Sequence, residues 1–342
     1  MPFQDETIER ILKRYPYPLA FPLKIAFAVD EREEPWKKVD AVLYSAEAVA
    51  RFLGVVALGE WSRLRDSGVV ATGARPAGAG SLNQRLERPS FGGWIEVSRE
   101  TLRFLQGYED QVVLPELVRF YEDRQAKAAL DELCTMRNTF GHAMDRSRLP
   151  KDTFRQIAGI ALGFLEDVLA ALLGLEQVSF SYVSTIELQK EKRRDPEFLY
   201  KGKRLDGMDF VKEATIKLAD RSYPHYKETD AVIIQFQERE RYLNLFPFFL
   251  YDEVHGKCAD LFYYNGRKGQ RLEYVACGYG GMMELRPAVS ERSGAGAQDW
   301  RSLVQGSGAE ASTDAETTGV VYAAVSAELT ALAALGAGGS AS

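Results

Sequence analysis

The chain is poor in the residues on which several classes of enzyme depend. It has three histidines and three cysteines in 342 residues, and Cys134, Cys258 and Cys277 are too scattered for a disulfide framework. It contains no Gly-x-x-x-x-Gly-Lys-Ser/Thr phosphate loop, no protein-kinase motif set and no Gly-x-Ser-x-Gly nucleophile turn. A Ser-His-Asp triad is nearly excluded as well, unless His142 serves in one. These absences leave few routes to catalysis.

Long apolar runs and excess positive charge are also missing. No stretch of about 18 uncharged apolar residues occurs, and no apolar run follows a basic N-terminal segment. We therefore expect a soluble cytoplasmic protein that does not associate with a membrane. The net charge of −6 argues against a protein that coats nucleic acid non-specifically, because such binding rests on many contacts between Lys or Arg and phosphate. A single small basic cleft stays compatible with that charge.

His255, Cys258 and Cys277 come closest to a zinc-binding set. A structural zinc ion normally takes four ligands, and the chain has no Cys-x-x-Cys pair to supply the missing one. We therefore expect no bound metal ion, and nothing in the sequence predicts another cofactor.

The N-terminal half has the periodicity of helices. Residues 35–65 carry apolar side chains at the i, i+3, i+4 spacing, and residues 151–174 form one broad apolar face. Proline ends a shorter helix at residue 15, and residues 66–80 are rich in Gly and Ala, which is typical of a loop. We expect an all-α domain over residues 1–176, with helices at 5–15, 35–65, 94–108, 111–122, 125–140 and 151–174.

The pattern changes to that of strands at about residue 178. Residues 178–183 alternate between apolar and polar, and Asn265-Gly266 is typical of a hairpin turn. We expect a mostly β domain over residues 177–289, with further strands at 231–237, 242–251, 259–264 and 272–277. Residues 290–342 are rich in Gly, Ala, Ser and Thr, which predicts a flexible tail, within which residues 320–335 could form a weak Ala-rich helix. The predicted fold class is α+β.

The segment Arg137–His142, with the sequence Arg-Asn-Thr-Phe-Gly-His, is the strongest functional signal. A neutral imidazole can take a proton from a ribose 2′-hydroxyl, and a guanidinium can hold the charge that develops on a phosphate. His142 and Arg137 together could therefore cut RNA without a metal ion. The alternative is that Arg137 is a surface cation at a helix C-terminus, where the helix dipole favours it, and that His142 is a linker residue.

This segment resembles the Arg-polar-(three residues)-His motif of HEPN domains, helical modules that include many prokaryotic endoribonucleases. The resemblance implies that His142 activates the 2′-hydroxyl or assists the leaving group, and that Arg137 binds the scissile phosphate. Asn138 would orient the phosphate or hold His142. It also implies a role in an antiviral or toxin system, with the β domain as the surface for a regulatory partner or ligand. A non-catalytic HEPN-like protein that binds RNA, a nucleotide or a partner effector is the other interpretation.

The spacing of the two residues bears on assembly. Positions five apart on a regular helix lie about 140° apart around its axis, so Arg137 and His142 would not share a face. Either the helix ends between them, as Gly141 suggests, or a second chain completes the site. HEPN nucleases typically use the second solution, so the resemblance implies a homodimer through the α domain.

A weaker candidate for RNA binding lies in residues 190–204. Basic residues could contact phosphates there, but the interleaved acidic residues favour a solvated loop. The candidates are Lys192, Arg193, Arg194, Lys201, Lys203 and Arg204.

Overall fold

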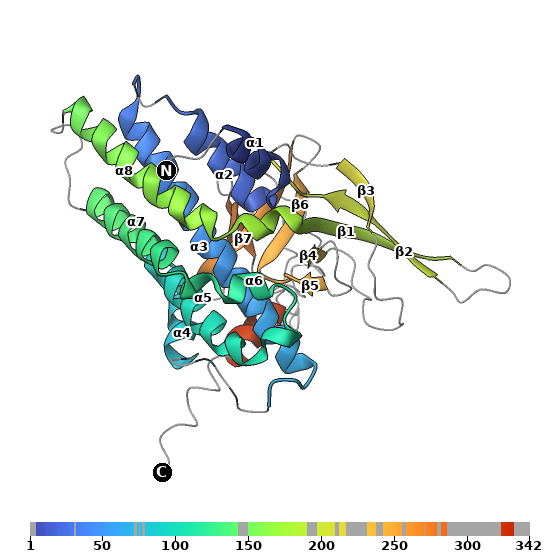
Figure 1. Cartoon of the computed structure of the whole chain (residues 1–342). Helices are drawn as coiled ribbons and strands as arrows, with labels where there is room; N and C mark the ends of the chain where they lie inside the picture. The colour runs from blue at the N-terminus through green and yellow to red at the C-terminus, as the bar shows by residue number, and fades with distance from the viewer. Residues whose placement is uncertain are drawn as a thin grey trace, which may run out of the picture. The chain divides into compact units, whose positions relative to one another are not determined.

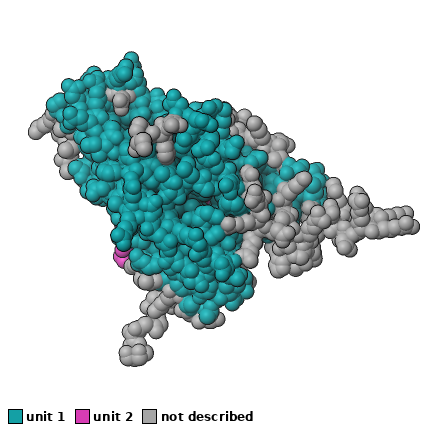
Figure 2. Space-filling view, in the orientation of Figure 1, with its two compact units in different colours: residues 1–77, 91–245 teal, residues 78–90, 246–342 magenta. Residues whose placement is uncertain are grey.

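A computed structural model of the chain divides it into two compact units (Figure 2). Unit 1 comprises residues 1–77 and 91–245, and unit 2 comprises residues 78–90 and 246–342. The structure describes residues 5–30, 32–71, 74, 76, 79–142, 150–189, 197–208, 212–216, 231–236, 242–254, 258–269, 271–278, 282–285 and 323–331. Within these ranges, the side chains of 79–81, 141–142, 188–189, 197–198, 212–214, 253–254 and 258–259 are not described.

Helices dominate the first part of unit 1 (Figure 1). The long ones are α3 (Pro35–Asp66), α7 (Arg124–His142) and α8 (Lys151–Ala170), and α3 packs against both of the others. The shorter elements are α1 (Asp5–Arg14), α2 (Tyr17–Ala28), α5 (Phe91–Leu105), α6 (Pro115–Val118) and the 3₁₀ helices η1 (Gln106–Gln111), η2 (Phe120–Glu122) and η4 (Leu173–Gln177).

The central helix α3 is apolar on most of its surface. Among the described residues it is the one helix long and apolar enough to cross a membrane, but 89% of its most apolar window is buried inside the protein. Such burial is what the core helix of a soluble protein shows. Gly54 allows α5 to approach closely, because a Cβ atom there would lie 2.5 Å from Cε3 of Trp94.

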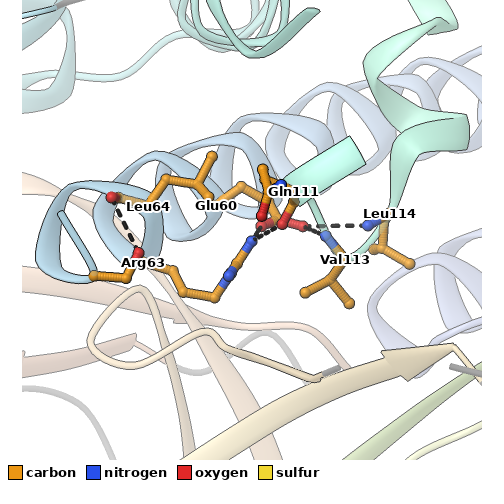
Figure 3. Close-up of polar contacts among 7 residues, drawn as sticks. Glu60, Arg63, Leu64, Gln111, Val113 and Leu114 are labelled. Carbon is orange, nitrogen blue, oxygen red and sulfur yellow. Dashed lines mark hydrogen bonds and ion pairs between the residues drawn. The ribbon is translucent and has the colours of Figure 1, made fainter. Parts of the chain in front are cut away.

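A buried carboxylate joins α3 to the segment after η1 (Figure 3). Glu60 is 2% exposed; its Oε1 accepts hydrogen bonds from the backbone N–H groups of Val113 (2.5 Å) and Leu114 (3.2 Å). Its Oε2 accepts two more from Arg63, at 3.1 and 3.0 Å. Four hydrogen bonds thus satisfy the carboxylate. They hold the segment 112–114, which is not helical, against the core.

Unit 1 also contains a five-stranded antiparallel sheet in the order β3-β2-β1-β4-β5. Its strands are β1 (Val178–Gln189), β2 (Glu197–Arg204), β3 (Lys212–Ile216), β4 (Ala231–Phe236) and β5 (Tyr242–Asn244). Phe180 of β1 is fully buried and its ring centroid lies 6.3 Å from that of Phe52 of α3. The sheet and the helices therefore share a core.

The domain boundary expected at residue 177 does not match these units. Backbone hydrogen bonds join the segment after β2 to the first two helices: Gly207 donates to the carbonyl of Tyr15 (2.7 Å) and Met208 to that of Leu12 (2.8 Å). Tyr17 in turn donates to the carbonyl of Leu205 (2.9 Å). The change of periodicity near residue 178 marks a change of secondary structure inside one unit. The α+β class itself is confirmed, with helices followed by antiparallel sheets.

Unit 2 combines a four-stranded antiparallel sheet with a helix from much earlier in the chain. The sheet order is β6-β7-β8-β9, with β6 (Phe249–Val254), β7 (Cys258–Lys268), β8 (Arg271–Ala276) and β9 (Met282–Leu285). The helix is α4 (Ala79–Glu87), which contacts β7. The hydroxyl of Tyr264 donates to the carbonyl of Leu86 at 3.0 Å, across 178 positions of sequence.

Several local expectations were wrong. Asn265-Gly266 is not a turn, because β7 continues through both residues with an irregular register there. Part of the segment expected to be a loop, 190–204, forms β2. Helix α4 was not expected, since its sequence begins in the Gly/Ala-rich segment. The weak Ala-rich helix expected at 320–335 is present at 323–331, and its Val325 and Leu329 are buried. Residues 290–322 and 332–342 of the predicted tail lie outside the described residues.

Candidate functional site

Helix α7 carries the Arg137–His142 segment. It begins after Asp123, whose Oδ1 accepts hydrogen bonds from the N–H groups of Gln125 (2.9 Å) and Ala126 (3.1 Å). This carboxylate satisfies two of the donors that a helix start leaves open and complements the helix dipole. One side of α7 is buried, through Ala126, Ala129, Leu130, Leu133 and Phe140. The cap and the buried face fix the rotation of α7 and hence the direction in which Arg137 points.

The helix does not end between Arg137 and His142. It continues through Gly141 to His142, so the expectation that Gly141 ends it was wrong. The two positions therefore keep the angular separation of about 140° that a regular helix imposes. The side chain of His142 lies outside the described residues, and the geometry of the imidazole stays untested.

A carboxylate of α3 meets Arg137. The Nε of Arg137 lies 3.7 Å from Oε2 of Glu47, and the side chain of Arg137 is 42% exposed. The other oxygen of Glu47, Oε1, accepts a hydrogen bond of 2.8 Å from Arg51, whose side chain is only 7% exposed. Glu47 thus bridges a buried and a half-exposed guanidinium. In the described part of the chain, the Nη nitrogens of Arg137 donate no hydrogen bond.

Asn138 faces a cysteine. Its side-chain amide donates a weak hydrogen bond of 3.9 Å to the Sγ of Cys134. Burial raises the pKa of the Cys134 thiol, and the nearby carboxylates of Asp131 and Glu47 raise it further. The thiol therefore stays protonated near neutral pH and is a poor nucleophile. Among the described residues, no hydrogen bond joins the side chain of Asn138 to that of Arg137.

A second arginine, which belongs to α5, contacts α7 near Cys134. Arg99 of α5 binds Asp131 at 2.5 Å, and its guanidinium carbon lies 5.5 Å from the ring centroid of Tyr121. The hydroxyl of Tyr121 shares a 2.5 Å hydrogen bond with that of Ser98. These contacts join α5, η2 and α7. They give Arg99 a structural role, because its charge is paired with Asp131.

The basic candidates near residue 200 are largely paired. Lys201 binds Glu187 on the neighbouring strand at 2.6 Å, and Arg204 pairs with Asp206. Lys203 lies on β2 between them. The other three candidates, Lys192, Arg193 and Arg194, lie outside the described residues, as does His255. The described part of this segment is an interior strand of the sheet, in which Lys201 and Arg204 are paired with carboxylates rather than available as a row of cations.

Sequence reasoning missed Glu47 and Arg51. Their i, i+4 spacing on an expected helix predicts an intrahelical ion pair. It does not predict that Glu47 also reaches Arg137, ninety positions later. That contact depends on how α3 and α7 pack.

Comparisons with known proteins give no relative for this chain. No family model, no curated protein and no solved structure matches it.

Proposed function

We propose that the protein is a metal-independent endoribonuclease of the HEPN type. The observation that supports this is the state of Arg137. Its guanidinium is anchored through Nε, half exposed, and presents two Nη groups that bind nothing else in the described part of the chain. Such a fork can hold two oxygens of one phosphate at once.

In the proposed reaction the ribose 2′-hydroxyl attacks the adjacent phosphorus. His142 takes the proton of that hydroxyl, or gives one to the leaving 5′-oxygen. Arg137 stabilises the charge that develops on the phosphate oxygens, and Asn138 helps to orient the phosphate. The P–O5′ bond breaks, and the products carry a 2′,3′-cyclic phosphate and a 5′-hydroxyl. No step requires a metal ion.

The test is incubation with total tRNA and mRNA in EDTA. We expect cleavage that falls by a factor of about 10² or more in Arg137→Ala and in His142→Ala. Arg103→Ala is the matched control, because Arg103 is an exposed arginine in an ordinary ion pair with Glu100 (3.0 Å). Undiminished cleavage by both site variants, once purified free of host nuclease, would contradict the proposal.

We further propose that the active species is a homodimer that pairs through the α7 face. Because α7 stays helical to His142, one chain cannot turn both residues to one side, and a second copy would complete the site. An exposed stripe of α7 lies on the side of position 142 and about 140–180° around the helix from Arg137, so a partner would approach from the side of His142. Its residues are Ala128, Glu132, Thr135 and Thr139.

Light scattering at micromolar concentration tests the dimer. We expect twice the mass of one chain, and the mass of one chain for Thr135→Arg, which places a charge in the centre of the stripe. A monomeric wild type with full cleavage activity would overturn this part of the proposal.

One observation favours the second interpretation, a non-catalytic cytoplasmic protein that binds RNA, a nucleotide or a partner effector. Glu47 offsets part of the positive charge of Arg137, which weakens its attraction for phosphate. On this interpretation the chain binds oligonucleotide or partner without cutting it, and unit 2 is the candidate surface for a regulatory partner or ligand. Binding without cleavage by wild type would favour it.

A further inference from the structure

The exposed side of α3 carries two large aromatic side chains in a helix that is largely buried. Trp36 is 43% exposed and Tyr44 is 37% exposed. A sector of about 80° around the helix axis, at 3.6 residues per turn, contains four exposed or partly buried positions. They are Trp36, Asp40, Tyr44 and Glu47. We call this set the α3 row.

The α3 row leads to the candidate phosphate site. Tyr44 precedes Glu47 by three positions, so the two side chains are neighbours on the helix surface. Glu47 in turn contacts Arg137. The ring of Tyr44 is therefore one helical turn from the residue that anchors the proposed phosphate ligand. Trp36 lies about 12 Å farther along the axis, at 1.5 Å per residue.

One cation lies near each end of this row, and the row itself contains the carboxylates of Asp40 and Glu47. The Nζ of Lys37 lies 5.3 Å from the ring centroid of Trp36 and also binds Glu34 at 2.5 Å. At the other end, the Nη groups of Arg137 donate no hydrogen bond to the described residues. Aromatic faces beside cations are the elements that bind single-stranded nucleic acid, because every base can stack on a ring and every phosphate can meet a cation. Stacked bases rise about 3.4 Å each, so the distance from Trp36 to Tyr44 suits a short single strand.

We infer that the α3 row is a base-stacking surface for single-stranded RNA, with Tyr44 under the nucleobase next to the phosphate that Arg137 holds. This inference rests on the proposed function and adds the form of the substrate to it. An unpaired strand is required, because a base inside a duplex does not present its face. Tyr44 and Trp36 then set affinity and site choice, while Arg137 and His142 act on the phosphate.

The test measures binding separately from cleavage. The probe is a fluorescein-labelled single-stranded oligodeoxynucleotide, which lacks the 2′-hydroxyl and cannot be cut by the proposed reaction. The full chain is titrated into it at low salt and anisotropy is recorded. We expect Tyr44→Ala to weaken binding about tenfold and Tyr44→Phe, which keeps the ring, to stay within about twofold. Trp36→Ala should weaken it by a similar factor. Ile160→Ala is the control, since Ile160 is an exposed apolar residue of α8.

The outcomes separate the two proposals. If Arg137→Ala weakens binding and neither aromatic variant does, the stacking surface is refuted and the phosphate site stands. If the aromatic variants weaken binding but Arg137→Ala does not, the phosphate site is refuted. A change of oligomeric mass in Tyr44→Ala, with unchanged affinity for the strand, would instead make the α3 row an interface between protein chains and overturn the inference.

Discussion

At the scale of single residues, Glu60 shows how a buried charge can be structural. Its carboxylate accepts four hydrogen bonds and is closed off from solvent. Removing it would leave the backbone N–H groups of Val113 and Leu114 without their acceptor in the core. Arg63 would keep only its hydrogen bond to the carbonyl of Gln111. Breaking a buried pair in this way costs about 3–5 kcal/mol.

We therefore predict that Glu60→Ala lowers the free energy of unfolding by about 3 kcal/mol or more. Glu100→Ala is the control, because its pair with Arg103 is on the surface and such pairs contribute about 0–1 kcal/mol. Urea unfolding followed by circular dichroism gives both values. A loss for Glu60→Ala no larger than that for Glu100→Ala would show that the segment 111–114 does not depend on the carboxylate.

The same residue predicts a pH effect of defined sign. Burial raises the pKa of Glu60 above its ordinary value near 4.5, and Arg63 with the N–H groups of Val113 and Leu114 opposes this only in part. The folded protein then keeps this proton to higher pH than the unfolded chain. The contribution of the group is full below about pH 4.5 and is lost as pH rises through the raised pKa.

Glu60→Gln, which does not titrate, isolates this contribution. We expect the wild type to lose stability relative to Glu60→Gln as pH rises from 4.5 towards neutrality, measured as the difference of their unfolding free energies at each pH. A difference that grows in favour of the wild type over that range would mean that Arg63 and the backbone donors outweigh burial.

At the scale of elements, the contact between α3 and α5 depends on the absence of a side chain. A methyl group at Gly54 would overlap the ring of Trp94, which is itself fully buried. Gly163 of α8 has nothing within 4 Å of where its Cβ would be. The packing around Gly54 therefore excludes a side chain, whereas the surroundings of Gly163 leave room for one.

We predict opposite effects of the same substitution. Gly54→Ala should destabilise the protein by about 1–3 kcal/mol through overpacking. Gly163→Ala should stabilise it by about 0.5–1 kcal/mol, because alanine favours the helix more than glycine does. Thermal unfolding of the two variants beside wild type measures both, and a shift of the same sign in both would refute the packing argument.

The elements also show what the sequence could and could not reveal. The apolar stripe of residues 35–65 predicted α3 almost to the residue, because helical periodicity is a local signal. Strand β2 was missed since its basic residues were taken as a solvated run, although Tyr200 is buried and Gly202 allows the carbonyl of Tyr182 to come close. The ion pair between Arg137 and Glu47 could not be predicted from local sequence patterns, because it depends on how α3 and α7 pack. Whether His142 completes the site stays a prediction.

At the scale of the whole molecule, the first sheet is part of the helical core. Phe52 and Phe180 are both buried and in ring contact. The carbonyl of Tyr15 accepts a hydrogen bond from Gly207, and that of Leu12 accepts one from Met208. A fragment that stops at residue 176 would expose the ring of Phe52 and leave both carbonyls without these donors.

We accordingly predict that residues 1–176 do not form a stable domain, contrary to the expectation from periodicity alone. The fragment 1–245, which retains the five strands, should unfold cooperatively in urea, and 1–176 should give a shallow transition or aggregate. Equal cooperativity of the two fragments would restore the boundary near residue 177.

The hydrogen bond between Tyr264 and Leu86 has a consequence for synthesis on the ribosome. Helix α4 is made 178 positions before the tyrosine that binds it. At about 5–20 residues per second, it would wait on the order of ten to thirty seconds for its strand. During that interval Leu82 and Leu86, both buried in the finished protein, have no sheet to cover them. The nascent chain would thus expose an apolar helix between the two segments of unit 1 while that unit folds. Exposed apolar segments of this kind are what chaperones bind.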